Sequence, residues 1–391
     1  MLTSLAIIFL MGLFLGTIFQ KCKLPGLLGM IITGILISPY AFDLIDQSIL
    51  HIAPDLRQIA LVIILTRAGL SLDISDLKRV GRPAVLMCFL PAVFEIAGTM
   101  LLAPKLLHVS VLDAAVIGSV IAAVSPAVIV PRMIRMMEEG YGKKHSIPQM
   151  ILAGASVDDV FVIVVFTAVT ALASTGIVNP LSFLKIPVSI VLGIALGILV
   201  GSILIWFFKK FHMRDSAKVL ILFSVSFLLL ELQNRLENIV PVSALLAIMS
   251  MGILIKRKYQ ILATRLSTKY NKLWVAAEII LFVLVGATVD LQYVYSAGVF
   301  AVMLLCGALL FRMAGVWLCL LGSELTRREK IFCMLAYTPK ATVQAAIGAV
   351  PLAMGLACGQ TVLTVAVLSI LITAPFGAIC VDNLYRKIDV S

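Results

Sequence analysis

Long apolar runs dominate this sequence of 391 residues. Thirteen stretches of about 17 to 25 residues, allowing for polar interruptions, are long enough to cross the hydrocarbon core of a bilayer as helices. Hydrophobic residues make up 61% of the chain and charged residues 13%, an apolar share well above that of soluble domains. The sequence therefore predicts an all-α polytopic membrane protein, with residues 1–391 forming a single membrane unit. The predicted spans are 2–19, 25–39, 56–71, 83–103, 111–133, 148–173, 186–208, 217–233, 238–255, 273–289, 295–321, 330–350 and 360–381.

Lysine and arginine residues gather in every second connection between these spans. The intervening connections hold only Arg57, Lys105, Lys185 and Arg235. Cytoplasmic loops are the ones enriched in Lys and Arg, so this alternation predicts an outside N-terminus and a cytoplasmic C-terminus. It also explains the net charge of +11 without nucleic acid as a partner. The basic connections carry Lys21 and Lys23; Lys78, Arg79 and Arg82; Arg132, Arg135, Lys143 and Lys144; Lys209, Lys210, Arg214 and Lys218; Lys256, Arg257, Lys258, Arg265, Lys269 and Lys272; Arg327, Arg328 and Lys330; Arg386 and Lys387.

Short motifs recur in the two halves of the chain. AGLSLD (68–73) resembles VGATVD (285–290), and AVSP (123–126) resembles AYTP (336–339). Gly69 and Gly286 stand 217 residues apart, as do Glu95 and Arg312. Spans one to six therefore map onto spans eight to thirteen. Because a single span separates the copies, the second enters the membrane from the opposite side, which predicts an inverted repeat. The copies would be residues 1–185 and 213–391, with 186–212 as a connector helix.

Two adjacent acids, Asp158 and Asp159, stand in the otherwise apolar stretch GASVDDVFVIVVF. Each charged side chain at the centre of a bilayer costs at least about 2.5 kcal/mol, so such a pair is expected to mark a functional pathway. Like charges this close cannot easily both ionise, and the pair should titrate as a unit. It could hold protons or a small cation. The alternative is a structural pair satisfied by buried cationic side chains.

A hydroxyl residue precedes a proline in the middle of two spans, at Ser125-Pro126 and at Thr338-Pro339. Proline removes a backbone donor and disfavours helix in the residue before it, so we expect both spans to be interrupted there. Backbone groups freed in a membrane must be buried in protein or line a cavity. A simple proline kink would explain either span alone, whereas matched interruptions in inverted halves indicate a binding site.

Three charged residues lie close to these features in the spans. Lys340 follows Pro339 directly and could neutralise a carboxylate or the negative carbonyl end of a half-helix. Arg312 keeps its proton at any physiological pH, which suits a permanent ion pair. Glu95 is its expected partner through the repeat, and Asp158 is the alternative.

Hard cations prefer oxygen ligands, and the candidates here are Asp158, Asp159 and Ser125. Weaker candidates for a site are Arg67, Glu278 and Gln344, each with a plain structural role as the alternative. No Cys/His cluster, phosphate-binding glycine loop or nucleophile elbow accompanies them, so the sequence does not predict an enzyme.

Four motifs together resemble the cation/proton antiporter superfamily and, within it, the NHA-type sodium/proton antiporters of bacteria and animals. They are LTRAGLSLD (65–73), AVSPAVIVP (123–131), GASVDDV (154–160) and PKATVQAAIG (339–348). The resemblance implies a core domain with two crossed, broken helices, and a homodimer in the bacterial inner membrane. It further implies exchange of sodium or lithium for protons by alternating access, without a cofactor. The physiological role that the resemblance implies is pH homeostasis.

Carried over by motif, the resemblance gives Asp159 as the direct cation ligand and Asp158 as the acid that pairs with a buried base. Ser125 stands where many relatives have the aspartate of Thr-Asp-Pro, a departure that the NHA-type branch shares. Potassium/proton exchange, or an uncoupled channel or sensor on the same fold, are the alternatives for function.

Overall fold

The computed structural model describes residues 1–71, 81–142, 144–175, 180–236, 242–289 and 291–388. Within these ranges the regular elements are α-helices, followed by one 3-10 turn at Tyr385–Lys387. The prediction of an all-helical chain is therefore confirmed. The helices are α1 (Leu2–Lys21), α2 (Gly26–Ile37), α3 (Gln47–Ser71), α5 (Arg82–Met87), α6 (Leu90–Leu106), α7 (Val111–Ile121), α8 (Pro126–Glu138), α9 (Ile147–Thr175), α10 (Pro180–Lys210), α11 (Asp215–Leu236), α12 (Ala244–Lys258), α13 (Gln260–Ala287), α14 (Leu291–Cys319), α15 (Arg327–Ala336), α16 (Thr342–Ile347), α17 (Val350–Ala353) and α18 (Gly359–Leu384).

Nine helical stretches in the described ranges are long and apolar enough to cross a membrane. Each predicted span overlaps one helix or a run of consecutive helices, and residues 238–241 of the ninth span lie outside the described ranges. The starts differ most where a helix begins with polar residues: α13 starts at Gln260 rather than 273, and α3 at Gln47 rather than 56. The sequence also missed the separation of α5 from α6. There Phe89 caps α6, and Pro91 occupies the first turn, where its missing N–H is tolerated.

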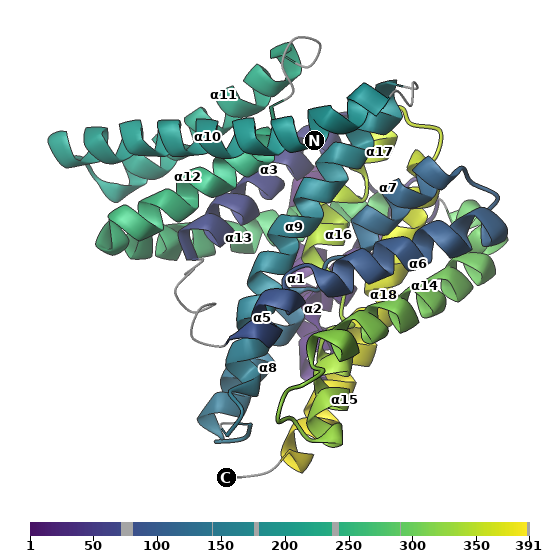
Figure 1. Ribbon diagram of the computed structural model, residues 1–391. Coiled ribbons are helices and arrows are strands. Elements are labelled where there is room, and N and C mark those ends of the chain that lie inside the picture. The colour runs from purple at the N-terminus through teal and green to yellow at the C-terminus, as the bar shows by residue number, and fades with distance from the viewer. Residues whose placement is uncertain (72–80, 143, 176–179, 237–241, 290, 389–391) are drawn as a thin grey trace. The chain divides into compact units, whose positions relative to one another are not determined.

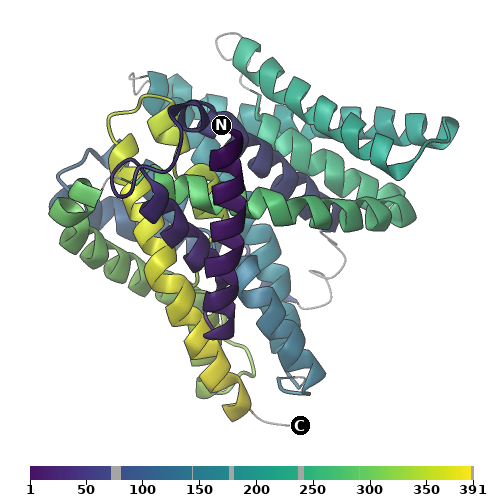
Figure 2. The same cartoon turned by 180° about the vertical axis from the view of Figure 1, so that it is seen from behind.

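The chain divides into two compact units, of which the first comprises Met1–Arg57, Ser75–Val162 and Ile279–Ser391. In this unit α6 and α14 run side by side (Figure 1), and α1 packs along the shorter α2 (Figure 2). Small residues allow the close approach of α6 and α14. A Cβ on Gly98 would lie 2.5 Å from the Phe311 side chain, and one on Gly315 would lie 2.8 Å from the Cα of Pro91. Such small-residue contacts are the common way in which membrane helices pack closely.

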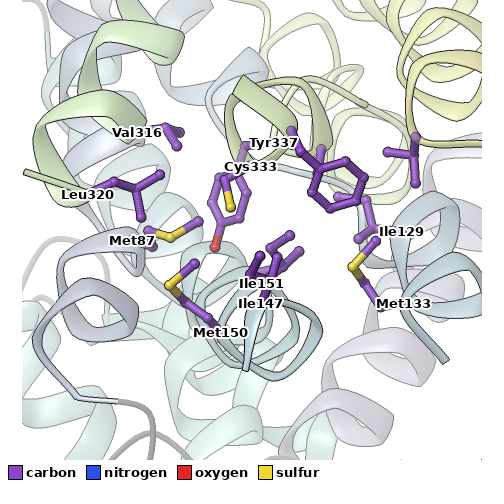
Figure 3. Packing of buried hydrophobic residues seen from close by; sticks show 14 of the residues in the cluster. Met87, Ile129, Met133, Ile147, Met150, Ile151, Val316, Leu320, Cys333 and Tyr337 are labelled. Carbon is purple, nitrogen blue, oxygen red and sulfur yellow. The ribbon is translucent and has the colours of Figure 1, made fainter. Parts of the chain in front are cut away.

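A buried apolar cluster fills the part of the first unit around α5, α8, α9 and α15. Figure 3 shows Tyr337 within it, among Met87, Ile151 and Cys333. A polar contact beside this cluster joins α8 to α18. Arg132 on α8 pairs with Asp382 on α18 over 3.1 Å.

The second unit comprises Gln58–Ile74 and Ile163–Glu278. Here α10 and α12 lie side by side (Figure 1). A Cβ on Gly193 would lie 2.6 Å from the Ser243 carbonyl oxygen, so glycine is what lets the two backbones approach. In the same unit the Arg67 guanidinium lies over the Trp274 ring, 5.9 Å from its centroid.

Candidate functional site

The first interrupted helix lies in the first unit, between α7 and α8. α7 ends at Ile121 and α8 begins at Pro126, with Ser125 as its N-cap in an extended backbone conformation. Proline in the first turn of α8 is compatible with its fixed φ and missing donor. The Ser125 side chain is buried, and its Oγ has no hydrogen-bond partner among the described residues.

The second interrupted helix lies between α15 and α16. α15 ends at Ala336 and α16 begins at Thr342. The Thr338 hydroxyl donates to the Leu335 carbonyl over 2.8 Å, so this hydroxyl has a partner where Ser125 has none. The Lys340 backbone N–H donates to the Thr373 hydroxyl on α18, also over 2.8 Å.

The two interruptions contact each other directly. The Ser125 backbone N–H donates to the Pro339 carbonyl over 2.8 Å. The Gln344 side chain makes a second link, because its Nε2 donates to the Ala123 carbonyl and its Oε1 accepts from the Ala341 N–H, each over 2.8 Å. Backbone groups freed by the two breaks are therefore paired across the crossing, as a membrane interior requires.

The aspartate pair lies on α9, where successive side chains point about 100° apart. Asp158 is fully buried, and its Oδ2 accepts hydrogen bonds from the Val124 N–H over 2.8 Å and from Arg312 over 2.9 Å. Its Oδ1 has no hydrogen-bond partner in the part of the chain that the structure describes. Asp159 is partly buried, and its Oδ1 is likewise buried without a partner there.

Arg312 on α14 lies at the centre of a buried ionic network. Its guanidinium pairs with both Glu95 and Asp158 at 2.9 Å, so both partners that the sequence leaves open are present. The Lys340 ammonium lies 2.6 Å from Glu95. Arg312 also donates to the carbonyls of Tyr337, over 2.6 Å, and of Ala122. These carbonyls stand at the C-terminal ends of α15 and α7, where the helix dipole is negative and a cation is stabilising.

The structure thus brings most of the candidate residues to one place in the first unit. Asp158, Arg312, Glu95 and Lys340 form one chain of ion pairs, with the two breaks beside it. Asp159 adjoins this chain as the residue next to Asp158 on α9. Several residues named from the sequence lie outside the described ranges, and these are Asp73, Lys78, Arg79, Lys143 and Asp290.

Three contributors were not identified from the sequence: Tyr337, Thr373 and the bridging role of Gln344. Tyr337 directly precedes the Thr-Pro pair of the second break, so its carbonyl could have been recognised as one at a helix end, where carbonyls lack an intrahelical donor. Thr373 gives no local signal, because it stands on a continuous helix.

A protein-family model described as "Sodium/hydrogen exchanger, transmembrane" matches residues 5–384 of this chain. The chain belongs to the sodium/hydrogen exchanger family. It is 34% identical over 379 residues to human sodium/hydrogen exchanger 9B2, covering 92% of this chain and 69% of that protein. Human sodium/hydrogen exchanger 9B1 is 31% identical over 415 residues, covering 99% of this chain and 78% of that protein.

A solved structure of the sodium proton antiporter MjNhaP1 from Methanocaldococcus jannaschii at pH 8 has the same fold as this exchanger. The TM-score is 0.85 at 20% identity, covering 98% of this chain and 97% of that chain. The resemblance to cation/proton antiporters of the NHA type is therefore confirmed. The exchanger is a multi-pass membrane cation/proton antiporter and not an enzyme, and the ions are its substrates, with no cofactor needed.

Proposed function

We propose that the exchanger moves sodium or lithium against protons by alternating access, with Asp158, Asp159 and Ser125 as the ion-binding residues. One observation supports this most directly. Ser125 Oγ, Asp158 Oδ1 and Asp159 Oδ1 are buried oxygens without a hydrogen-bond partner among the described residues. Unpaired buried acceptors are costly, and oxygen is the ligand that hard monovalent cations take. Carboxylate oxygens also take protons, so cation and proton would compete for one site.

The charges of the network favour this competition. Arg312 and Lys340 contribute two positive charges, and Glu95, Asp158 and Asp159 contribute up to three negative ones. With all five ionised the net charge is −1, which one proton or one monovalent cation neutralises. A neutral site crosses the apolar interior at a lower free-energy cost than a charged one. The loaded site would therefore change sides, whereas the empty site would not.

We further propose the inverted-repeat organisation, with residues 1–185 and 213–391 as copies and 186–212 as the connector. One interrupted helix lies in each half of the sequence, at Pro126 and at Pro339, which is the arrangement that such repeats give to transporter sites. The alternating Lys and Arg residues favour an outside N-terminus and a cytoplasmic C-terminus. A homodimer in the bacterial inner membrane follows from the family resemblance.

The test is Asp159→Asn in proteoliposomes that report cation-driven proton flux. The substitution keeps the shape of the side chain and removes its charge, so we expect exchange to be abolished in a protein that still folds. Asp113→Asn is the matched control, because Asp113 lies in the first turn of α7 and bonds to Ser110. It should keep exchange. Full flux from Asp159→Asn would refute the assignment.

A panel of sodium, lithium and potassium gradients in the same assay identifies the transported cation. Stoichiometric exchange distinguishes the antiporter from a channel, which would conduct without coupling the two ions. Activity with potassium alone would identify potassium, rather than sodium or lithium, as the transported cation. The assignment of the ion-binding residues would stay the same.

A further inference from the structure

Gln344 lies on α16, fully buried between the two helix breaks. Its side-chain amide makes hydrogen bonds to both of them. Oε1 accepts from the Ala341 N–H at the start of α16, and Nε2 donates to the Ala123 carbonyl beyond the end of α7. A longer contact of 3.4 Å joins Nε2 to the Ile121 carbonyl. Among uncharged side chains only a primary amide offers an acceptor and two donors at once, which is what this position uses.

The Ala123 carbonyl belongs to the same peptide group as the Val124 N–H. That N–H donates to Asp158 Oδ2 over 2.8 Å, while Gln344 Nε2 donates to the carbonyl over 2.8 Å. The peptide group is planar and rigid, so fixing its oxygen also fixes the direction of its N–H. Hydrogen bonds in such a chain polarise one another, and the donor at the far end becomes stronger.

We propose that Gln344 is a positioning residue of the exchanger, which acts on Asp158 through the Ala123–Val124 peptide. By holding this peptide, Gln344 keeps the Val124 N–H on Asp158 Oδ2, which also accepts from Arg312, and so orients Oδ1 for the transported ion. Gln344 therefore orients a proposed ligand of the cation that it does not touch. The inference rests on the proposed role of the aspartate pair.

Gln344→Met removes both the donor and the acceptor at similar side-chain length. Without Gln344 the Val124 N–H is no longer held on Asp158, so the carboxylate is less well oriented for the cation and the KM for sodium should rise about threefold to tenfold. Because cation and proton compete for one site, weaker cation binding should also move the pH profile of exchange by about half a unit to one unit towards alkaline pH. The maximal rate at saturating sodium should stay within about twofold, since Asp158 and Asp159 are still present. The assay is proton flux in proteoliposomes over series of sodium concentration and pH.

The chain offers a matched control in Gln233, whose Oε1 accepts from the Ala244 N–H at the start of α12 over 2.7 Å. This glutamine caps a helix start in the second unit. Gln233→Met should lower the melting temperature without changing the KM for sodium or the pH profile. Equal changes of KM and profile in both variants would overturn the inference, because a general loss of stability would then explain them.

Gln344→Asn serves as a second variant if Gln344→Met does not fold. It keeps an amide, but the side chain is one methylene shorter and cannot reach both breaks, so the same direction of change is expected. A purely structural role would lower the melting temperature or the maximal rate and leave KM and the pH profile unchanged, and that result would also overturn the inference. Exchange by Asp159→Asn would instead refute the proposed function, so the two failures are distinguishable.

Discussion

The two hydroxyl residues at the helix breaks differ in bonding, and this difference makes a sharp prediction. Ser125 Oγ has no hydrogen-bond partner among the described residues, whereas Thr338 Oγ1 donates to the Leu335 carbonyl over 2.8 Å. A buried hydroxyl left unpaired costs about 1–3 kcal/mol. Ser125→Ala therefore removes a destabilising group and breaks no hydrogen bond to the described residues. We expect its melting temperature to equal or exceed that of the unchanged exchanger.

The affinity for the cation should change in the opposite sense. If Ser125 Oγ is a ligand, the substitution deletes one oxygen from the transport complex. By analogy with hydrogen bonds to charged groups, such a contact contributes about 1.5–3 kcal/mol. Since 1.4 kcal/mol corresponds to a factor of about ten in an equilibrium constant, the KM for sodium should rise at least about tenfold. Proton flux in proteoliposomes at varied sodium concentration measures this change.

Thr338→Val is the matched control, because it has nearly the same shape and deletes a hydroxyl that already has a partner. Loss of that bond should cost about 0.5–1.5 kcal/mol of stability. The KM for sodium should stay within about twofold of the unchanged value. The reasoning is refuted if Ser125→Ala keeps an unchanged KM, or if it melts below Thr338→Val.

Two further substitutions test the packing of the network. Arg312→Lys keeps the charge, but one ammonium cannot bond to the two carboxylates and two carbonyls that Arg312 reaches. Loss of two charge-assisted hydrogen bonds should lower the free energy of unfolding by about 3–6 kcal/mol. A melting temperature equal to that of the unchanged protein would contradict this. Gly154→Ala should cost about 1–3 kcal/mol, because the Tyr337 hydroxyl fills the space where the new Cβ would lie. Tyr337→Phe in the same chain should restore most of that loss in a thermal melt, and a double variant as unstable as Gly154→Ala alone would disprove the contact.

The features that depend on local chemistry were predictable from the sequence. Apolar length indicates where helices lie in a bilayer, and each predicted span overlaps helical structure. Proline restricts its own backbone and that of the residue before it, so Pro126 and Pro339 indicate where the structure interrupts a helix. The start of α13 was misplaced because its first residues are polar, and hydropathy finds only the part of a helix that is apolar.

The choice of partners within the site was not predictable. Glu95 and Asp158 were alternatives for Arg312, and the structure pairs Arg312 with both. Which acids a guanidinium reaches depends on how α6, α9 and α14 are rotated about their axes. Apolar periodicity determines this rotation poorly when a helix is apolar on all sides, as membrane-spanning helices are. The role of Gln344 was hidden for a related reason, since its two partners belong to backbone groups that become free only when both helices break.

The pairing of the freed backbone groups explains why this site would select for ions that compete with protons. The carbonyls of Ala122, Ala123, Tyr337 and Pro339 each accept a hydrogen bond from the protein. Breaks in membrane helices commonly supply such carbonyls as ligands for a transported ion. Here the buried oxygens left without a hydrogen-bond partner in the described residues include Oδ1 of Asp158 and Oδ1 of Asp159. A carbonyl binds a cation without titrating, whereas a carboxylate binds either a cation or a proton. In the proposed site the charged ligands are therefore carboxylates, which a cation and a proton would occupy in turn, and this competition is the physical condition for exchange.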